Sequence, residues 1–272
     1  MGEETGPVRG ADDPAAPERQ AGGPAEIDAL EEALSLVRGA DEVGIPLRLV
    51  GGLAVRVLCP DFPPRVRDRQ DLDLASVSRA RAALTAFLAA RGYEPDRRFN
   101  ALYGHKQLFF ASPRGRAVDV LIDKLDMCHV LPFHDRIERM PLTLDVTDLL
   151  LSKLQIVELN EKDVRDVLYL LSAYPVAEGD EPGTIGLDRI RALVADDWGW
   201  WRTLTLNVSR IRALAAERGD LVPPAPSLDP LRGLEAVAEA AEAVPKTLRW
   251  KLRARVGERK RWYRLPEEIQ HD

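Results

Sequence analysis

Two stretches of this sequence carry residue types suited to chemistry on a phosphate group. In the first, an apolar run at residues 47–50 leads into the glycine pair Gly51 and Gly52. In the second, the carboxylates Asp71 and Asp73 alternate with leucines. Residues two apart in a strand face the same side, so both carboxylates are expected on one face. Two such carboxylates repel each other unless a cation lies between them, and Mg²⁺ prefers oxygen ligands of this kind.

The glycine pair is expected where a strand passes into a helix. Residues 47–50 have the apolar character of a strand, and residues 54–58 are predicted to be helical. Glycine lets the backbone approach a phosphate closely, and the N-terminus of a helix attracts anions. Together with the two carboxylates, this arrangement predicts metal-assisted chemistry on a nucleoside triphosphate.

A predicted β-hairpin supplies a third carboxylate. Residues 107–110 and 117–123 are strand-like, and a turn at residues 112–115 separates them. Asp119 lies inside the second apolar run, where an unpaired charge is costly. An isolated acid in a strand is more often an edge or end residue, so the residue pattern alone leaves its role open. Asp123 shares the face of Asp119 by parity and is the reserve candidate.

The glycine pair followed by the Asp-x-Asp segment resembles the signature of the nucleotidyltransferase superfamily, which has the DNA polymerase β-like fold. The resemblance covers residues 26–175. It implies a third metal-site acid on a strand next to the Asp-x-Asp strand, and Asp119 matches that position by its order in the chain. The resemblance therefore implies that Asp71, Asp73 and Asp119 are the catalytic residues and hold Mg²⁺ in a two-metal site. It also implies that the glycine pair contacts the nucleoside triphosphate.

A second match lies downstream, in two predicted helices. Lys153 in the first, with Asp163 and Asp166 in the second, resembles the motif of AbiEii-like toxins of type IV toxin–antitoxin systems. In that family a lysine and an Asp-x-x-Asp helix close over the nucleotide, which implies nucleotide-binding roles for Lys153 and Asp163. The alternative is purely structural, because Lys162 and Asp166 can form an i,i+4 ion pair worth about 0.2–0.5 kcal/mol.

Three arginines precede the Asp-x-Asp segment in a proline-rich connection, namely Arg65, Arg67 and Arg69. They can form a solvated loop whose charge offsets the acidic site, or one of them can contact a triphosphate. Arg69 is the favoured nucleotide-binding candidate because it lies nearest to Asp71 in the sequence.

The order of the elements predicts an α+β protein. Residues 1–25 are rich in Gly, Pro, Ala and acidic residues and are expected to be disordered. Residues 26–140 are expected to form the nucleotidyltransferase-like domain, a small mixed sheet with flanking helices. Residues 141–272 are expected to form a helical region with a basic terminal segment. Apolar spacing predicts helices over residues 27–38, 78–92, 142–160, 161–173, 187–195, 200–218 and 228–243. Ser76 or Ser78 is the expected N-cap of the second of these helices, and Thr147 that of the third.

The basic terminal segment, residues 246–264, interleaves lysines and arginines with Trp250, Trp262 and Tyr263. Such a mixture can bind an RNA backbone and stack on bases, although a charge-rich terminal helix is more often a solvated face. The net charge of −6 argues against a protein that coats nucleic acid non-specifically.

Several other classes are disfavoured by composition. The two cysteines, Cys59 and Cys128, form neither a zinc pattern nor a disulfide framework. No apolar run is long enough to span a membrane, and the N-terminal residues lack the pattern of a signal peptide. A cytoplasmic protein with no membrane partner is expected.

The resemblance implies transfer of NMP from an NTP to an acceptor hydroxyl. The acceptor can be RNA such as tRNA, a protein or a small molecule, and an antitoxin is an expected partner of the toxin type. Two other classes stay open. A regulatory protein of the same fold would bind a nucleotide without turnover, and an antibiotic-type transferase would modify small hydroxylated compounds.

Overall fold

The computed structural model describes residues 28–61 and 71–265. The segment expected to be disordered, residues 1–25, lies outside these ranges. So do Arg65, Arg67 and Arg69, the arginines ahead of the Asp-x-Asp segment.

A five-stranded mixed sheet lies at the centre of the first half of the chain, in the order β1-β2-β5-β4-β3. Its strands are β1 (Leu47–Leu49), β2 (Leu72–Ser76), β3 (Glu94–Pro95), β4 (Gln107–Ala111) and β5 (Ala117–Ile122). β2 runs antiparallel to β1 and parallel to β5, while β4 pairs antiparallel with β5 and with β3. The predicted hairpin of β4 and β5 is confirmed.

Alternating burial gives the central strands one apolar face. Leu72 and Leu74 of β2 are buried, as are Val118 and Val120 of β5, and the residues between them are half-buried. Because successive side chains in a strand point to opposite faces, the leucines and valines fill the core. The carboxylates between them therefore share the other face.

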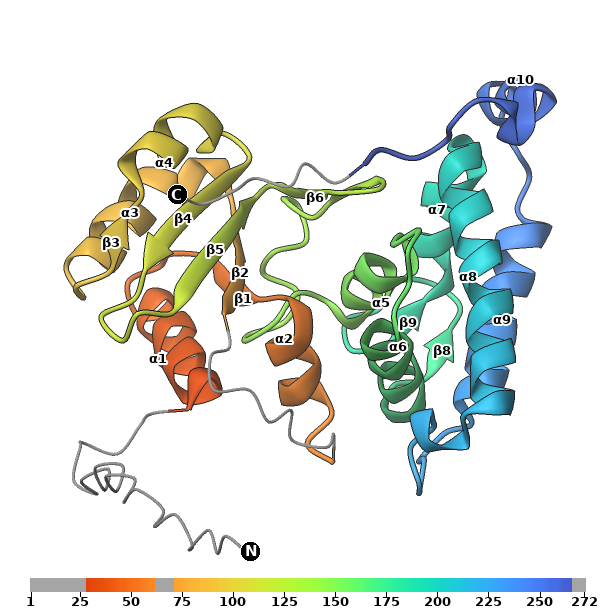
Figure 1. Cartoon of the computed structure of the whole chain (residues 1–272), viewed down its shortest axis with the longest axis horizontal. Coiled ribbons are helices and arrows are strands. Elements are labelled where there is room, and N and C mark those ends of the chain that lie inside the picture. The colour runs from red at the N-terminus through yellow and green to blue at the C-terminus, as the bar shows by residue number, and fades with distance from the viewer. Residues whose placement is uncertain (1–27, 62–70, 266–272) are drawn as a thin grey trace, which may run out of the picture.

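Four helices accompany the sheet (Figure 1): α1 (Ala29–Asp41), α2 (Gly51–Leu58), α3 (Arg81–Ala89) and α4 (Arg97–Tyr103). α1 continues past Gly39, which was expected to end it. α2 begins at Gly51 itself rather than after the glycine pair. The short elements β3 and α4 were not predicted, because they span too few residues to show a clear apolar period.

The predicted serine caps are wrong. A 3-10 turn over Ser78–Ala80 precedes α3, and the N-cap residue of neither element makes a side-chain cap hydrogen bond. Ser76 Oγ instead donates to the Pro46 carbonyl at 2.7 Å. The carboxylate of Asp123 accepts a hydrogen bond from the Ser78 backbone N–H at 2.9 Å. Asp123 itself has a left-handed backbone, with φ of 64°. The reserve candidate Asp123 therefore has a local structural role.

The second half of the chain is mainly helical, which confirms the predicted α+β class. Its helices are α5 (Val146–Leu154), α6 (Glu161–Ala173), α7 (Leu187–Asp196), α8 (Trp198–Glu217), α9 (Pro230–Ala243) and α10 (Leu248–Val256). Two small ribbons pair β6 (Lys124–Asp126) with β7 (Val130–Pro132) and β8 (Val176–Ala177) with β9 (Ile185–Gly186). No helix within the described ranges is both long and apolar enough to cross a membrane.

α6 has the predicted bounds, whereas α5 does not. The N-cap of α5 is Asp145, whose carboxylate accepts from the Thr147 N–H, so the predicted Thr147 cap is wrong. α5 ends at Leu154 instead of Asn160. Asn160 is the N-cap of α6, and its side-chain oxygen accepts from the N–H groups of Lys162 and Asp163. Its cap therefore starts a helix where the apolar pattern alone predicts an end.

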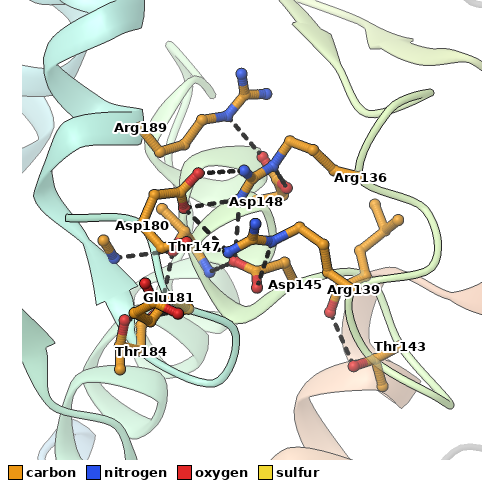
Figure 2. Close-up of polar contacts among 12 residues, drawn as sticks. Arg136, Arg139, Thr143, Asp145, Thr147, Asp148, Asp180, Glu181, Thr184 and Arg189 are labelled. Atoms are coloured by element: carbon orange, nitrogen blue, oxygen red, sulfur yellow. Dashed lines mark hydrogen bonds and ion pairs between the residues drawn. The ribbon is translucent and has the colours of Figure 1, made fainter.

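A buried ion network joins the segment before α5 to the helical half (Figure 2). Arg136 donates to Asp148 at 2.6 Å, to Asp145 at 3.2 Å, and to Asp180. Arg189 of α7 donates to the other oxygen of Asp148 at 3.0 Å. Burial raises the pKa of Asp148, while Arg189 and Arg136 oppose that shift. The arginines thus compensate the charges of Asp145 and Asp148, which have no access to water.

Replacing Arg136 by alanine should strongly destabilise the fold. Asp145 and Asp148 are fully buried and would lose a partner, which typically costs about 3–5 kcal/mol in free energy of unfolding. Arg218→Ala is the matched control, since Arg218 also bridges two carboxylates, Glu161 and Asp220, at the surface. Urea unfolding should show a far smaller loss for the control. Similar losses for both variants would contradict the role assigned to the network.

Candidate active site

Asp73 of β2 and Asp119 of β5 lie directly opposite each other. The two strands are parallel neighbours, and their register pairs Asp73 with Asp119. Both side chains are half-buried, on the face of the sheet away from the buried leucines and valines. The adjacency that the resemblance implied is thus a direct cross-strand pairing of two acids. Like charges placed directly opposite each other are destabilising.

The electrostatics of Asp73 reflect this contact. Burial and the neighbouring charge of Asp119 raise the pKa of Asp73 to about 6, against the opposing effect of Lys153. Asp119 is oriented by β4, because Gln107 Nε2 donates to Asp119 Oδ1 at 2.5 Å. Gln107 was not predicted as a site residue. The hairpin register, which pairs Phe109 with Asp119, places Gln107 close to that carboxylate.

Asp71 lies just before β2 and is exposed. Among the described residues, no group of three or more histidines, cysteines and carboxylates is arranged to hold a metal ion. The structure therefore brings Asp73 and Asp119 together but does not preform the predicted set of three. The pair itself fits a divalent cation, because two adjacent, half-buried carboxylates offer hard oxygen ligands and need a compensating charge.

The glycine turn packs against Asp73. Gly51 has φ of 63°, and a Cβ atom there would lie 2.6 Å from Asp73 Oδ2. The Val50 N–H donates to the Asp73 carbonyl at 3.0 Å, which fixes the turn to β2. Both the backbone conformation and the space require glycine at this position. Gly52 follows as the second residue of α2.

The N-cap residue of α2 does not cap the helix through its side chain. It is Val50, which makes no side-chain hydrogen bond to the helix. The first N–H groups of a helix need acceptors, and anions commonly supply them. This end of α2 lies beside Asp73, so an anion bound there would lie close to a cation held by the carboxylate pair.

Lys153 of α5 bridges Asp163 and Asp166 of α6. Its Nζ lies 3.1 Å from Asp163 Oδ1 and 2.9 Å from Asp166 Oδ2. Burial would lower the pKa of Lys153, but Asp166 and Asp163 outweigh that effect and raise it. Asp166 thus has Lys153 as an ion-pair partner. Lys153 is a permanent cation near Asp73.

A cleft of about 670 Å³ collects these groups. Of the residues predicted from the sequence, Gly51, Asp73, Asp119, Lys153 and Asp163 line it. Gly52 and Asp71 are not among its lining residues, and Arg69 lies outside the described ranges. Polar residues that were not predicted also line the cleft, namely Lys106, Gln107, Lys124, Asp126, Ser152, Asn160 and Arg264.

No known protein family and no curated protein matches the chain in sequence. Among solved structures, the antibiotic-resistance factor ANT(2'')-Ia is similar, with 12% identity, TM-score 0.37, and coverage of 70% of this chain and 96% of that one. An antigenic nucleotidyltransferase-like protein from Paracoccidioides brasiliensis has 17% identity, TM-score 0.37, and coverage of 80% and 94%. The CD-NTase CdnG of Bradyrhizobium diazoefficiens, in complex with GTP, has 17% identity, TM-score 0.25, and coverage of 85% and 90%. All three similarities are distant.

Gly51→Ala should damage both the fold and the carboxylate pair. Gly44→Ala is the matched control, because Gly44 has φ of 71° but no atom within 4 Å of the place that a Cβ would take. The control should cost about 1–2 kcal/mol for its left-handed backbone alone. Gly51→Ala should cost more in urea unfolding and should also weaken stabilisation by Mg²⁺, because Asp73 must move. Equal losses, with Mg²⁺ stabilisation intact, would contradict the close approach.

Without divalent cations, the contribution of Asp73 to stability should fall as pH rises from 4 to 7. The folded-state pKa of Asp73 is about 6 against an ordinary 3.8, so this carboxyl binds more protons in the folded protein than in the unfolded chain within this window. Asp73→Asn removes that loss and should unfold at higher urea at pH 8, by on the order of 2 kcal/mol, with no gain below pH 4. Glu94→Gln, at an exposed carboxylate, is the control. An Asp73→Asn variant less stable than the wild type at pH 8 would contradict the assigned repulsion.

Proposed function

We propose that this protein is a Mg²⁺-dependent nucleotidyltransferase that moves NMP from an NTP to an acceptor hydroxyl. The observation that carries the proposal is the register pairing of Asp73 and Asp119 beside the N-terminus of α2, within one cleft. The N-cap residue of that helix, Val50, makes no side-chain cap hydrogen bond. This arrangement offers a cation site and an anion site next to each other. A metal–triphosphate complex needs both.

Asp73 and Asp119 would hold Mg²⁺. Asp71, the residue just before β2, would be the third carboxylate of the metal site. When bound, Mg²⁺ supplies charge stabilisation to the attacking and leaving oxygens of an in-line displacement. The Gly51–Gly52 turn and the first N–H groups of α2 would bind the phosphates. Gln107 orients the Asp119 carboxylate through its 2.5 Å hydrogen bond. Asp119 would then accept the proton of the acceptor hydroxyl.

The reaction balances without any further reactant. The acceptor oxygen forms a bond to the α-phosphorus, and the bond from that phosphorus to the bridging oxygen of the β-phosphate breaks. Pyrophosphate leaves with the electron pair of that bond. Lys153, kept charged by Asp163 and Asp166, would offset negative charge in the cleft.

The finer assignment is an AbiEii-like toxin. It rests on the arrangement of Lys153 with Asp163 and Asp166, which match the downstream motif and meet in space. That type would have an antitoxin as partner and RNA, a protein or a small molecule as acceptor. A nucleotide-binding regulator without turnover and a small-molecule transferase are the competing outcomes of the test.

The test is transfer of label from each α-³²P-labelled NTP, with Mg²⁺, into total RNA, protein and small molecules. Asp73→Asn and Asp119→Asn should each reduce transfer at least ~100-fold, because each removes a carboxylate that would hold the Mg²⁺. Glu94→Gln should transfer as the wild type does.

Each other outcome distinguishes a competing class. Label in small molecules alone, with no growth arrest on expression, favours the antibiotic-type transferase. Mg²⁺-dependent NTP binding without transfer favours the regulator. Absence of both binding and transfer overturns the assignment of the site.

A further inference from the structure

The end of the chain returns to the cleft. After α10 the chain runs back toward β6 (Figure 1). We call residues 260–265 the strap. Its last two residues, Arg264 and Leu265, line the same cleft as Asp73 and Asp119. The cleft therefore has a wall made by residues that the glycine and carboxylate motifs do not include.

The strap is held by contacts that do not involve the Arg264 side chain. The backbone N–H of Arg264 donates to the Cys128 carbonyl at 3.0 Å. The Trp262 indole N–H donates to Thr203 Oγ1 of α8 at 3.0 Å. A Cβ at Gly199 would lie 2.6 Å from the Trp262 carbonyl, so the backbone of the strap packs directly on α8. These contacts fix the strap, while the side chain of Arg264 stays exposed.

The aromatic rings near the end of the chain are engaged in packing. Trp262 meets Trp198 edge to face, with ring centroids 6.1 Å apart. Trp250 meets Trp201 in the same manner at 5.2 Å. The sequence pattern offered these rings as surfaces for stacking RNA bases. Their packing against α8 gives these rings a structural role. The charged residues of the strap are then the ones to consider for ligand binding.

Two cations share one carboxylate where the strap meets β6. Arg264 forms an ion pair with Asp126, and Lys124 Nζ lies 3.3 Å from Asp126 Oδ2. The Arg264 side chain is 62% exposed. All three residues line the cleft. This cluster carries a surplus positive charge, and an arginine with an exposed side chain can exchange a carboxylate for a phosphate of similar geometry.

We propose that Arg264, assisted by Lys124, binds the phosphate chain of the nucleoside triphosphate, and that Asp126 occupies Arg264 until the nucleotide arrives. The proposal rests on the proposed function, since it assigns a further binding residue to the same cleft. Asp126 is then an internal competitor for the ligand. Removing the arginine and removing its competitor should therefore change triphosphate affinity in opposite directions.

The experiment measures binding of Mg²⁺ complexes of ATP, GTP, CTP and UTP, and of inorganic tripolyphosphate, to the full chain by calorimetry. Arg264→Gln should weaken binding at least ~5-fold, since charged hydrogen bonds to phosphate are stronger than neutral ones. Asp126→Asn should strengthen binding ~2-fold or more, because it removes the carboxylate charge that competes with the phosphate for Arg264. Arg264→Lys should fall between the wild type and Arg264→Gln, because it keeps the charge and loses the bidentate geometry. Arg255→Gln, an exposed arginine of α10 outside the cleft, is the matched control and should bind as the wild type does. Thermal unfolding of each variant checks that the fold is retained.

Several outcomes would overturn the proposal. Arg264→Gln binding within twofold of the wild type would do so, as would an equal loss for Arg255→Gln, which would indicate a general effect of charge. Weaker binding by Asp126→Asn would assign the ion pair to holding the strap and not to competing with the ligand. If the wild type binds none of the triphosphates, the proposed function fails and this inference fails with it. If the wild type binds and only the Arg264 variants behave as the control does, the inference alone fails.

Discussion

The repulsion between two carboxylates on neighbouring parallel strands is the constraint on which the rest of the site depends. Asp73 and Asp119 are paired in register, and the burial of their apolar neighbours prevents either strand from turning its acid away. A shift of one residue in either strand would place the acid of that strand in the core, where an unpaired charge is costly. The sheet therefore holds the two charges together, and a cation is the group that relieves the resulting repulsion.

The surroundings of the pair fit this constraint. Gly51 gives Asp73 the space that any side chain would take, and Gln107 holds one oxygen of Asp119. The positive charge of Lys153 reduces the electrostatic cost of the Asp73 carboxylate, since it opposes the rise in the pKa of Asp73. A phosphate chain at the N-terminus of α2 and a metal at the carboxylates would each compensate the other's charge.

The helical half contributes directly to the site in the sheet. The connection to α5 pairs with the edge strand β1, where Leu49 exchanges backbone hydrogen bonds with Leu142 and Leu144 at 2.9 and 3.0 Å. The network around Arg136 then fixes the start of α5 through the cap residue Asp145. Since Lys153 lies near the end of α5, the position of its ammonium group in the cleft depends on these buried contacts. The stability of the network and the geometry of the site are thus linked.

Local features could be predicted from the amino-acid sequence: the period of two in β2 and β5, the glycine pair at the strand–helix junction, and the bounds of α6. Each depends on residues close together in the chain, so the pattern contains the physical cause. Cap chemistry was harder to predict, because Asp145 and Asn160 compete with other polar residues that suit a helix start equally well. The folded structure was needed to show that Asp73 meets Asp119 in register, that Gln107 reaches that carboxylate, and that Arg264 pairs with Asp126 across 138 residues of sequence. These contacts join segments whose relative placement depends on the packing of the whole core, and no local period or motif encodes that placement.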